Sequence, residues 1–247
     1  MTEEATGGLG LPASIEAAWG RLEHSGRGPK RGLSLDGIVG AAIRVADTEG
    51  LAGVSMGRVA TELGTSAMSL YRYLSAKDEL VALMVDAALG PPPAGGDAPA
   101  DWRAALSRWA RAYHDALRRR PWILQVPLAG PPITPNATAW LEGGLGALGA
   151  TRLSEPQKLS VMLLLSGFVR SAAALAADIG AHAGGEIMPS WGALLHRLTD
   201  AERFPALHAA LRSEAFARDD DPDDEFFFGL ERILDGVAVL VDSRRAR

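Results

Sequence analysis

Residues 55–80 read SMGRVATELGTSAMSLYRYLSAKDEL, and this stretch decides the fold. Two short apolar patterns of helical spacing flank Leu63-Gly64-Thr65 with almost no linker between them. Ser55 suits the N-cap of the first helix, and Gly64 suits the left-handed backbone conformation that ends it. We therefore expect a helix over about 55–63 and a second over about 66–74, which together form a helix-turn-helix.

The second predicted helix has an apolar side and a polar side. Leu70 and Leu74 are spaced to anchor it in a core, which leaves its polar residues near the surface. In a helix-turn-helix the second helix enters the major groove of DNA, while the first lies across the backbone. Tyr and Ser hydroxyls suit phosphate oxygens, and Arg72 suits phosphate or guanine. The spacing by itself leaves open a three-helix packing unit with no role in DNA binding.

Helical patterns continue on both sides of this stretch. Upstream, Ser34 is a good N-cap for an apolar stripe that stops at Gly50. Downstream, Ser75 and Asp78 have the spacing of a capping box, which predicts the start of another helix. A Pro- and Gly-rich run then breaks the chain. The expected division is a flexible extension with a basic arm at 1–33, a DNA-binding domain at 34–89, a linker at 90–100 and a helical domain at 101–247. Within the extension, Ile15, Ala18, Trp19 and Leu22 have the spacing of a short helix.

The composition excludes several classes of protein. The chain has 247 residues, of which 47% are hydrophobic and 6% aromatic, and its net charge is −5. This balance favours an all-α fold over a β-sandwich. The absence of cysteine excludes disulfide scaffolds, thiol nucleophiles and cysteine-based metal sites. No signal peptide is visible, and the longest apolar run, 161–169, is too short to span a bilayer, so we expect a cytoplasmic protein.

Other motifs do not indicate catalysis. Residues 144–149 spell G-x-G-x-x-G, but a helical pattern precedes them where a dinucleotide site needs a strand. The five histidines show no metal-binding spacing. We expect no enzyme activity, no cofactor and no metal.

Two predicted helices of the C-terminal part are apolar over much of their surface. The helix from Glu155 carries two apolar stripes, and the closing helix has a wide apolar face. Such helices must be covered, which fits a four-helix interface between two copies of the chain. A core formed entirely within one chain is the alternative. Because small-molecule pockets are mainly apolar and aromatic, the candidate lining residues are Trp109, Tyr113, Phe168 and Trp191.

The order and spacing of motifs over residues 35–86 resemble the TetR family of transcriptional regulators. The motifs are Ala46-Asp47-x-Glu49-Gly50-Leu51, Val59-Ala60-x-Glu62-Leu63-Gly64, Ser69-Leu70-Tyr71-Arg72-Tyr73 and Lys77-Asp78-Glu79-Leu80. The resemblance implies a dimeric repressor that binds a palindromic operator and is released by a small molecule. It carries the family's DNA contacts onto Ser55, Met56, Ser66, Ala67, Met68, Ser69, Tyr71, Arg72, Tyr73 and Lys77.

Two further features bear on DNA binding. Gly57 stands where many family members place Arg or Lys aimed at DNA, so either Arg58 substitutes in part for that contact or the contact is missing. Before the first helix of the DNA-binding domain, Arg27, Lys30 and Arg31 form a basic arm suited to the DNA backbone or the minor groove. A solvated linker is the alternative for the arm.

Functions of two other classes compete with a regulator. One is a helical small-molecule-binding protein or enzyme with a vestigial DNA-binding head, and the other is an adaptor for protein interactions. An intact recognition helix with Tyr71, Arg72 and Lys77 favours the regulator. The absence of a catalytic constellation argues against the enzyme.

Overall fold

The computed structural model describes residues 11–20, 33–93, 101–127, 130–182, 187–213 and 222–245. Every regular element within these residues is a helix, as the composition predicts. In chain order the elements are α1 (Ala13–Ala18), α2 (Leu35–Glu49), η1 (Leu51–Gly53), α3 (Met56–Glu62), α4 (Ala67–Leu70), α5 (Lys77–Leu89), α6 (Trp102–Arg119), η2 (Pro121–Gln125), α7 (Pro135–Ala147), α8 (Glu155–His182), α9 (Ile187–Leu198), α10 (Pro205–Leu211) and α11 (Pro222–Arg245).

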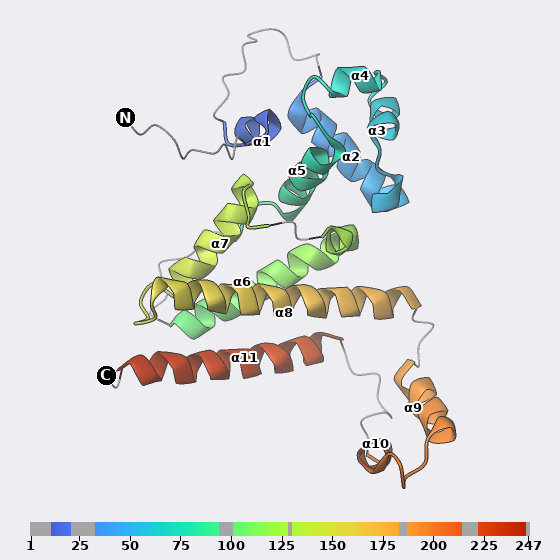
Figure 1. Ribbon diagram of the computed structural model, residues 1–247, viewed down its shortest axis with the longest axis vertical. Coiled ribbons are helices and arrows are strands. Elements are labelled where there is room, and N and C mark those ends of the chain that lie inside the picture. The colour runs from blue at the N-terminus through green and yellow to red at the C-terminus, as the bar shows by residue number, and fades with distance from the viewer. Residues whose placement is uncertain are drawn as a thin grey trace, which may run out of the picture.

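Helices α1 to α5 form a head, and α6, α7, α8 and α11 form a body beneath it (Figure 1). In the head, α2 packs against both α3 and α5. Ile38, Val59 and Leu80, one from each of these helices, are fully buried. Ser34 caps α2, because its side chain accepts a hydrogen bond from the backbone N–H of Gly37, as the sequence predicts.

Helix α1 lies inside the segment that was expected to be an extension. Ile15 is buried against the head, and Ser14 Oγ donates a hydrogen bond of 2.6 Å to Glu79 Oε2 on α5. Trp19 Nε1 donates a hydrogen bond of 2.8 Å to the carbonyl of Ile133, in the segment before α7. The extension therefore contains a packed helix that contacts both head and body.

Two carboxylates connect the head to the body. Asp86 on α5 is only 6% exposed, and its oxygens accept hydrogen bonds from Ala137 N (2.9 Å) and Asn136 Nδ2 (3.1 Å) in the first turn of α7. Asp47 on α2 accepts a hydrogen bond of 2.8 Å from Trp122 Nε1 in η2. A buried carboxylate is costly without donors, so the bonds to Asp86 help to fix how the head sits on the body, while the exposed Asp47 adds a second contact.

The body core forms where α6 packs on α7, α8 and α11. Leu106, Leu165 and Leu234, from α6, α8 and α11, are fully buried. By length and composition α8 is apolar enough to cross a membrane over residues 155–178. The sequence prediction considered only the shorter run 161–169 and therefore underestimated the length of the apolar segment. Only 28% of its most apolar window is buried within the chain. Much of α8 is therefore left for another surface to cover.

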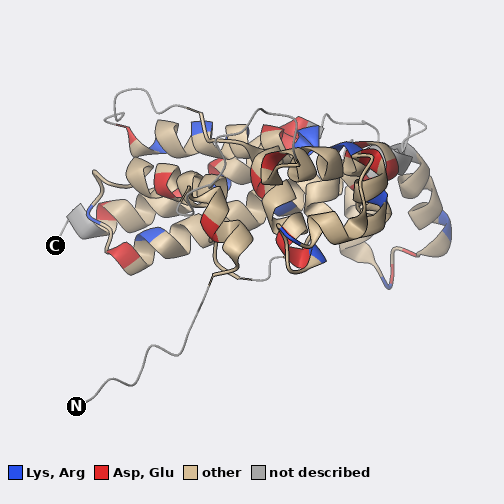
Figure 2. Cartoon of the chain, turned by 90° about the horizontal axis from the view of Figure 1, so that it is seen from above, with Lys and Arg blue, Asp and Glu red and all other residues tan. Residues whose placement is uncertain are grey.

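Charges of both signs are interspersed over the described helices in the view of Figure 2. In that view the described helices show no single acidic face. Local groups of charges decide which surface can approach DNA.

Replacing Asp86 with alanine should lower the free energy of unfolding by about 1–3 kcal/mol, because the substitution removes the only side-chain acceptor shown for the partly buried Ala137 N and one of the two acceptors of Asn136 Nδ2. Chemical denaturation measures this loss. The control is Asp115→Ala, which removes an exposed carboxylate from α6 and should change the free energy of unfolding by less than about 0.5 kcal/mol. Equal, small losses in the two variants would contradict the role of Asp86 at the junction.

Candidate nucleic-acid interface

The turn between α3 and α4 is closed by backbone hydrogen bonds. Gly64 N donates to the carbonyl of Thr61 (3.1 Å), and Thr65 N donates to the carbonyl of Ala60 (2.9 Å). These two bonds form a Schellman motif, which requires the left-handed conformation that Gly64 adopts with φ of 64°. The turn holds α4 at a steep angle to α3, which is the arrangement of a helix-turn-helix.

The second helix of this motif is shorter than predicted. Regular helix ends at Leu70, whereas the pattern predicted helix to about residue 74, and residues 71–73 form turns. Tyr73 N still donates to the carbonyl of Leu70 (2.9 Å), so the chain keeps coiling in the same sense. Leu70 and Leu74 are both fully buried, as predicted. They anchor the segment and leave Tyr71 and Arg72, which lie between them, exposed.

Most of the predicted DNA contacts on this segment face solvent. Met68 and Tyr71 are 76% and 50% exposed, which is unusual for large side chains unless they meet a partner. Ser66 Oγ and Ser69 Oγ are 3.0 Å apart and share a hydrogen bond. The exposed predicted contacts of the head are Ser55, Ser66, Met68, Tyr71, Arg72 and Lys77, and Ala67 and Ser69 are half-buried.

Two predicted contacts have structural roles. Met56 is buried in the head core, because it shares the inner face of α3 with Val59 and Ala60, three and four residues on. The Tyr73 hydroxyl donates a hydrogen bond of 2.7 Å to the carbonyl of Leu33. Burial of Met56 argues against a DNA contact by its side chain, and a contact by the half-buried Tyr73 stays a prediction. Met56 packs in the head core, and Tyr73 links the segment 66–73 to Leu33, just before α2.

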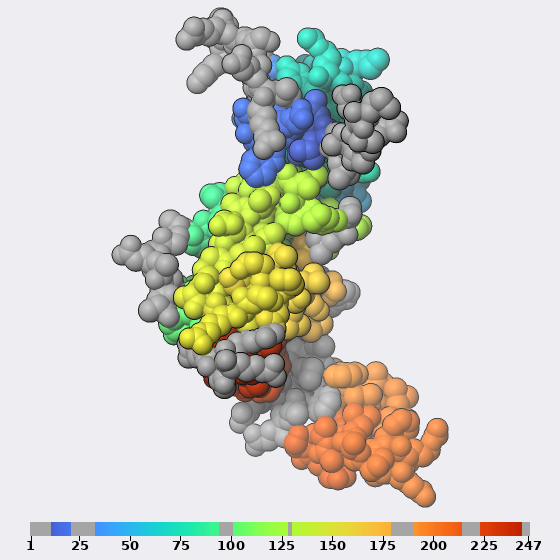
Figure 3. Space-filling model, turned by 60° about the vertical axis from the view of Figure 1, so that its left-hand side comes forward, coloured from blue at the N-terminus to red at the C-terminus, as the bar shows by residue number. Residues whose placement is uncertain are grey.

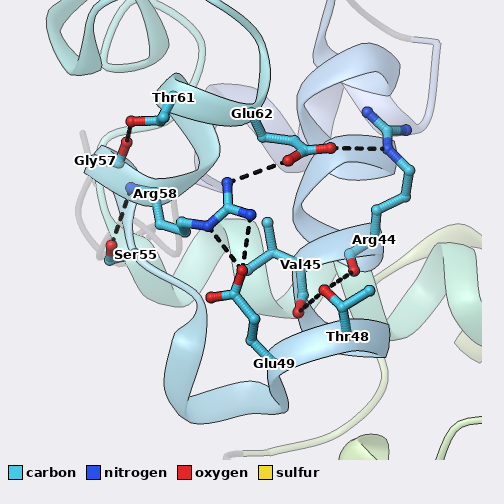
Figure 4. A network of polar contacts seen from close by, with 9 residues as sticks. All are labelled: Arg44, Val45, Thr48, Glu49, Ser55, Gly57, Arg58, Thr61 and Glu62. Carbon is cyan, nitrogen blue, oxygen red and sulfur yellow. Dashed lines mark hydrogen bonds and ion pairs between the residues drawn. The ribbon is translucent and has the colours of Figure 1, made fainter.

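Arg58 is held in an ion-pair network between α2 and α3 (Figure 4). Its guanidinium lies 2.7 Å from Glu49 Oε1 and 3.1 Å from Glu62 Oε2, and Arg44 reaches the same Glu62 at 3.4 Å. Hydrogen bonds to Glu49 and then to Glu62 raise the pKa of Arg58, and the bond from Arg58 lowers the pKa of Glu62. Because two carboxylates already pair with this guanidinium, a DNA contact by Arg58 in place of the cation missing at Gly57 would have to compete with them, and it stays a prediction.

Helix α5 begins with different capping contacts from those predicted. Its N-cap is Ala76 and makes no side-chain cap, so the expected capping box at Ser75 is absent. Instead, Glu79 Oε2 accepts hydrogen bonds from Ser75 N (3.1 Å) and from Ser14 Oγ (2.6 Å). Lys77 is the first helical residue and is exposed. It lies beside backbone amides that favour an anion such as phosphate.

The predicted basic arm, Arg27, Lys30 and Arg31, lies outside the described residues. Both of its neighbouring segments are attached to the head. Helix α1 packs on α5, and Leu33 is bonded by Tyr73. The described residues on both sides of the arm, α1 and Leu33, are therefore held against the head.

The predicted small-molecule residues occupy three separate places. Trp109, Tyr113 and Trp140 form one aromatic cluster in the body, with ring centroids 5.2–5.9 Å apart. Phe168 belongs to a different stack of rings between α8 and α11. Trp191 is exposed on α9, which packs on α10 and stands apart from the body (Figures 1 and 3). The structure therefore does not bring Trp191 into a site with the others.

Sequence reasoning missed His114 on α6. Its side chain is buried in the body, although neither its spacing nor its neighbours resemble a metal or catalytic motif. The available signal was one histidine on the apolar face that also carries Ala110 and Leu117. Among the described residues, no group of three or more His, Asp or Glu side chains could hold a metal.

Comparisons with known families and proteins agree with this geometry. Residues 38–84 match "Bacterial regulatory proteins, tetR family", and residues 93–241 match "Tetracyclin repressor-like, C-terminal domain". The chain is 38% identical over 253 aligned residues to the HTH-type transcriptional repressor DrrR1 of Streptomyces coeruleorubidus, covering 98% of this chain and 91% of DrrR1. It is 30% identical over 153 residues to an HTH-type transcriptional regulator of Saccharopolyspora erythraea, covering 62% and 64% of the two chains.

Solved structures give the same picture. The TetR family protein ActR of Streptomyces coelicolor, in complex with actinorhodin, superposes with a TM-score of 0.76 at 26% identity, over 85% of this chain and 99% of ActR. The same protein without ligand superposes with a TM-score of 0.70 at 27% identity, over 83% and 96% of the two chains. The likeness spans both the head and the body.

Tyr71→Ala and Arg72→Ala should each weaken binding to DNA from the region flanking the protein's own gene by about 1–3 kcal/mol. Both side chains are exposed, so the helix content should stay as in the wild type. Fluorescence anisotropy of labelled DNA measures the affinity. Arg108→Ala, which removes an exposed arginine of the body, is the control and should leave the affinity unchanged. Wild-type affinity in both head variants would remove the proposed contact surface.

Proposed function

Because this chain belongs to the TetR family, we propose that it represses transcription as a homodimer that binds a palindromic operator and is released by a small molecule. The matches over 38–84 and 93–241, together with the identity to DrrR1, make it a helix-turn-helix transcriptional repressor of a non-enzymatic family. The observation that carries the proposal is the outward display of Tyr71 and Arg72 on a segment anchored in the head core. The regulator is soluble, and we place it in the cytoplasm.

The division of labour follows the proposed domain boundaries. The domain at 34–89 reads DNA, the linker at 90–100 connects it to the body, and the domain at 101–247 binds the partner copy and the effector. Arg27, Lys30 and Arg31, in the extension at 1–33, follow the DNA next to the head.

Exposed apolar surface on α8 and α11 supports the homodimer. Leu163 on α8 is 76% exposed, and Leu164 and Val239 are also open to solvent. A groove of about 430 Å³ runs between the two helices and is lined mainly by apolar side chains such as Val161 and Leu240. Soluble proteins cover apolar surface of this kind. Four helices from two copies would cover it in an interface larger than about 1,200 Å².

The polar junction supports release of DNA by an effector. Asp47 bonds η2, which follows α6, and Asp86 bonds the first turn of α7. A molecule that binds among the body helices more tightly in one arrangement shifts the population toward that arrangement. Through these bonds the shift would move each head, so that the two no longer fit successive grooves. The complex of the similar ActR with actinorhodin supports a small molecule as the effector.

The DNA affinity should fall steeply with salt, because each neutralised phosphate adds about 0.9 to the slope of log K against log salt. Gly57→Lys should make the slope steeper by about 0.9 if the new ammonium group neutralises one more phosphate. The site accepts the change, since a Cβ on Gly57 would meet no atom within 4 Å.

Anisotropy titrations between low and physiological salt measure these slopes. Gly57→Ala is the matched control, because it adds the Cβ without the charge and should keep the wild-type slope. A flat wild-type response would rule out phosphate contacts. Equal slopes for the two Gly57 variants would show that this position does not face DNA.

Leu163→Glu should convert the dimer into monomers, because it introduces a charge from each copy into an apolar interface. The free chain should fold as before, since the leucine is exposed in it. Sedimentation equilibrium measures the change. Ala52→Glu, at an exposed position in the head, is the control and should remain dimeric. A dimeric Leu163→Glu variant, or a wild type that stays monomeric at high concentration, would contradict the assigned interface.

A further inference from the structure

The unusual group in the body is the imidazole of His114. The side chain is 3% exposed, and among the described residues its Nε2 atom has no hydrogen-bond partner. Leaving a buried polar atom unpaired is destabilising, and native folds contain few such atoms. His208, which is also buried, shows the ordinary case, because its Nε2 lies 3.0 Å from Thr199 Oγ1. Within the described part of the chain, the fold thus supplies a partner for Nε2 of His208 and not for Nε2 of His114.

The imidazole of His114 is part of a stack of aromatic rings. Its ring stacks on Phe226 of α11 with a centroid distance of 4.0 Å and an angle of 8°. Phe226 in turn stacks on Phe168 of α8 at 5.8 Å and 13°. Gly229 allows this approach, since a Cβ there would lie 2.5 Å from the Phe168 ring. Three helices therefore contribute one ring each to a near-parallel stack, and one of these rings, the imidazole, carries the unpaired Nε2.

The charge state of His114 fits a hydrogen-bonding role. Burial lowers its pKa, and Arg118 lowers it further, against the opposing effect of Asp223 on α11 and Asp115 on α6. The imidazole is therefore neutral near pH 7. A neutral imidazole either donates or accepts at Nε2, depending on its tautomer. A hydroxyl group can pair with both forms, because it donates and accepts.

We propose that His114 is the polar anchor of the effector site, between α6, α8 and α11, and that the effector is a planar aromatic molecule with a hydroxyl group. The hydroxyl bonds Nε2 in the plane of the imidazole, so the rest of the molecule extends in that layer, beside the face of Phe226. Stacking against aromatic rings favours a flat ligand. This assignment rests on the proposed function, since it names residues and a ligand class for the effector of that repressor.

The test compares two probes of the same shape, 2-naphthol and naphthalene, by equilibrium dialysis against the purified full-length protein. We expect the wild type to bind 2-naphthol at least about tenfold more tightly, because a site built around a hydrogen bond discriminates against the analogue that lacks it. His114→Phe keeps an aromatic ring but removes the nitrogen, so the ratio should fall to about one. His208→Phe is the matched control and should keep the wild-type ratio.

Thermal unfolding without ligand separates the proposed role from a purely structural one. The two roles predict opposite changes in the unfolding midpoint of His114→Phe. His114→Phe should raise the midpoint by about 2–4 °C, because it removes an unpaired polar atom and retains an aromatic ring. His208→Phe should lower the midpoint, because it breaks the bond to Thr199. A lower midpoint for both variants would show that His114 is paired within the fold, and would overturn the proposal.

The probe ratios decide the remaining cases. A wild-type ratio near one, as expected if an internal water satisfies Nε2, would overturn the proposal, as would a tenfold ratio that survives His114→Phe. Binding of wild-type protein to DNA from its own flanking region is measured separately. If DNA binding is absent but the His114-dependent ratio is present, the repressor function fails and the aromatic site stands. With DNA binding and no such ratio, only the site is wrong.

Discussion

The tight turn at Gly64 is the constraint on which the rest of the structure depends. Its left-handed backbone allows two hydrogen bonds to close α3, and α4 begins at Ala67 directly after this turn. Leu70 and Leu74 can then enter the head core while Tyr71 and Arg72 point outward. A side chain at Gly64 would strain this conformation. The DNA-facing surface is thus a consequence of one backbone geometry.

The charged groups of the head divide into those that hold the fold and those that remain open. Arg58 is paired with Glu49 and Glu62, and this network fastens α3 to α2. Asp47 and Asp86 then fasten the head to η2 and α7. Because these contacts are specific and directional, the head can move with the body as a unit. Arg72 and Lys77 are exposed and positive, which is the state required for phosphate contacts.

Local chemistry made part of this structure predictable. The cap at Ser34, the glycine turn and the inner leucines each follow from a short-range preference that the fold also satisfies. The features that the sequence did not predict come from contacts between distant residues. The pairing of Arg58 with Glu49, the bond from Tyr73 to Leu33 and the distance of Trp191 from the body depend on packing that no spacing encodes. The burial of His114 belongs to the same class, because α11 supplies the ring that covers it.

In the proposed function, two copies of the segment 66–73 occupy successive major grooves of one duplex. Hydroxyl-radical footprinting on the DNA that flanks the gene tests this claim most directly. We expect two protected segments related by two-fold symmetry, with centres about one helical turn, roughly 10 base pairs, or a multiple of it apart. A single protected stretch without symmetry, or uniform weak protection along the fragment, would contradict it.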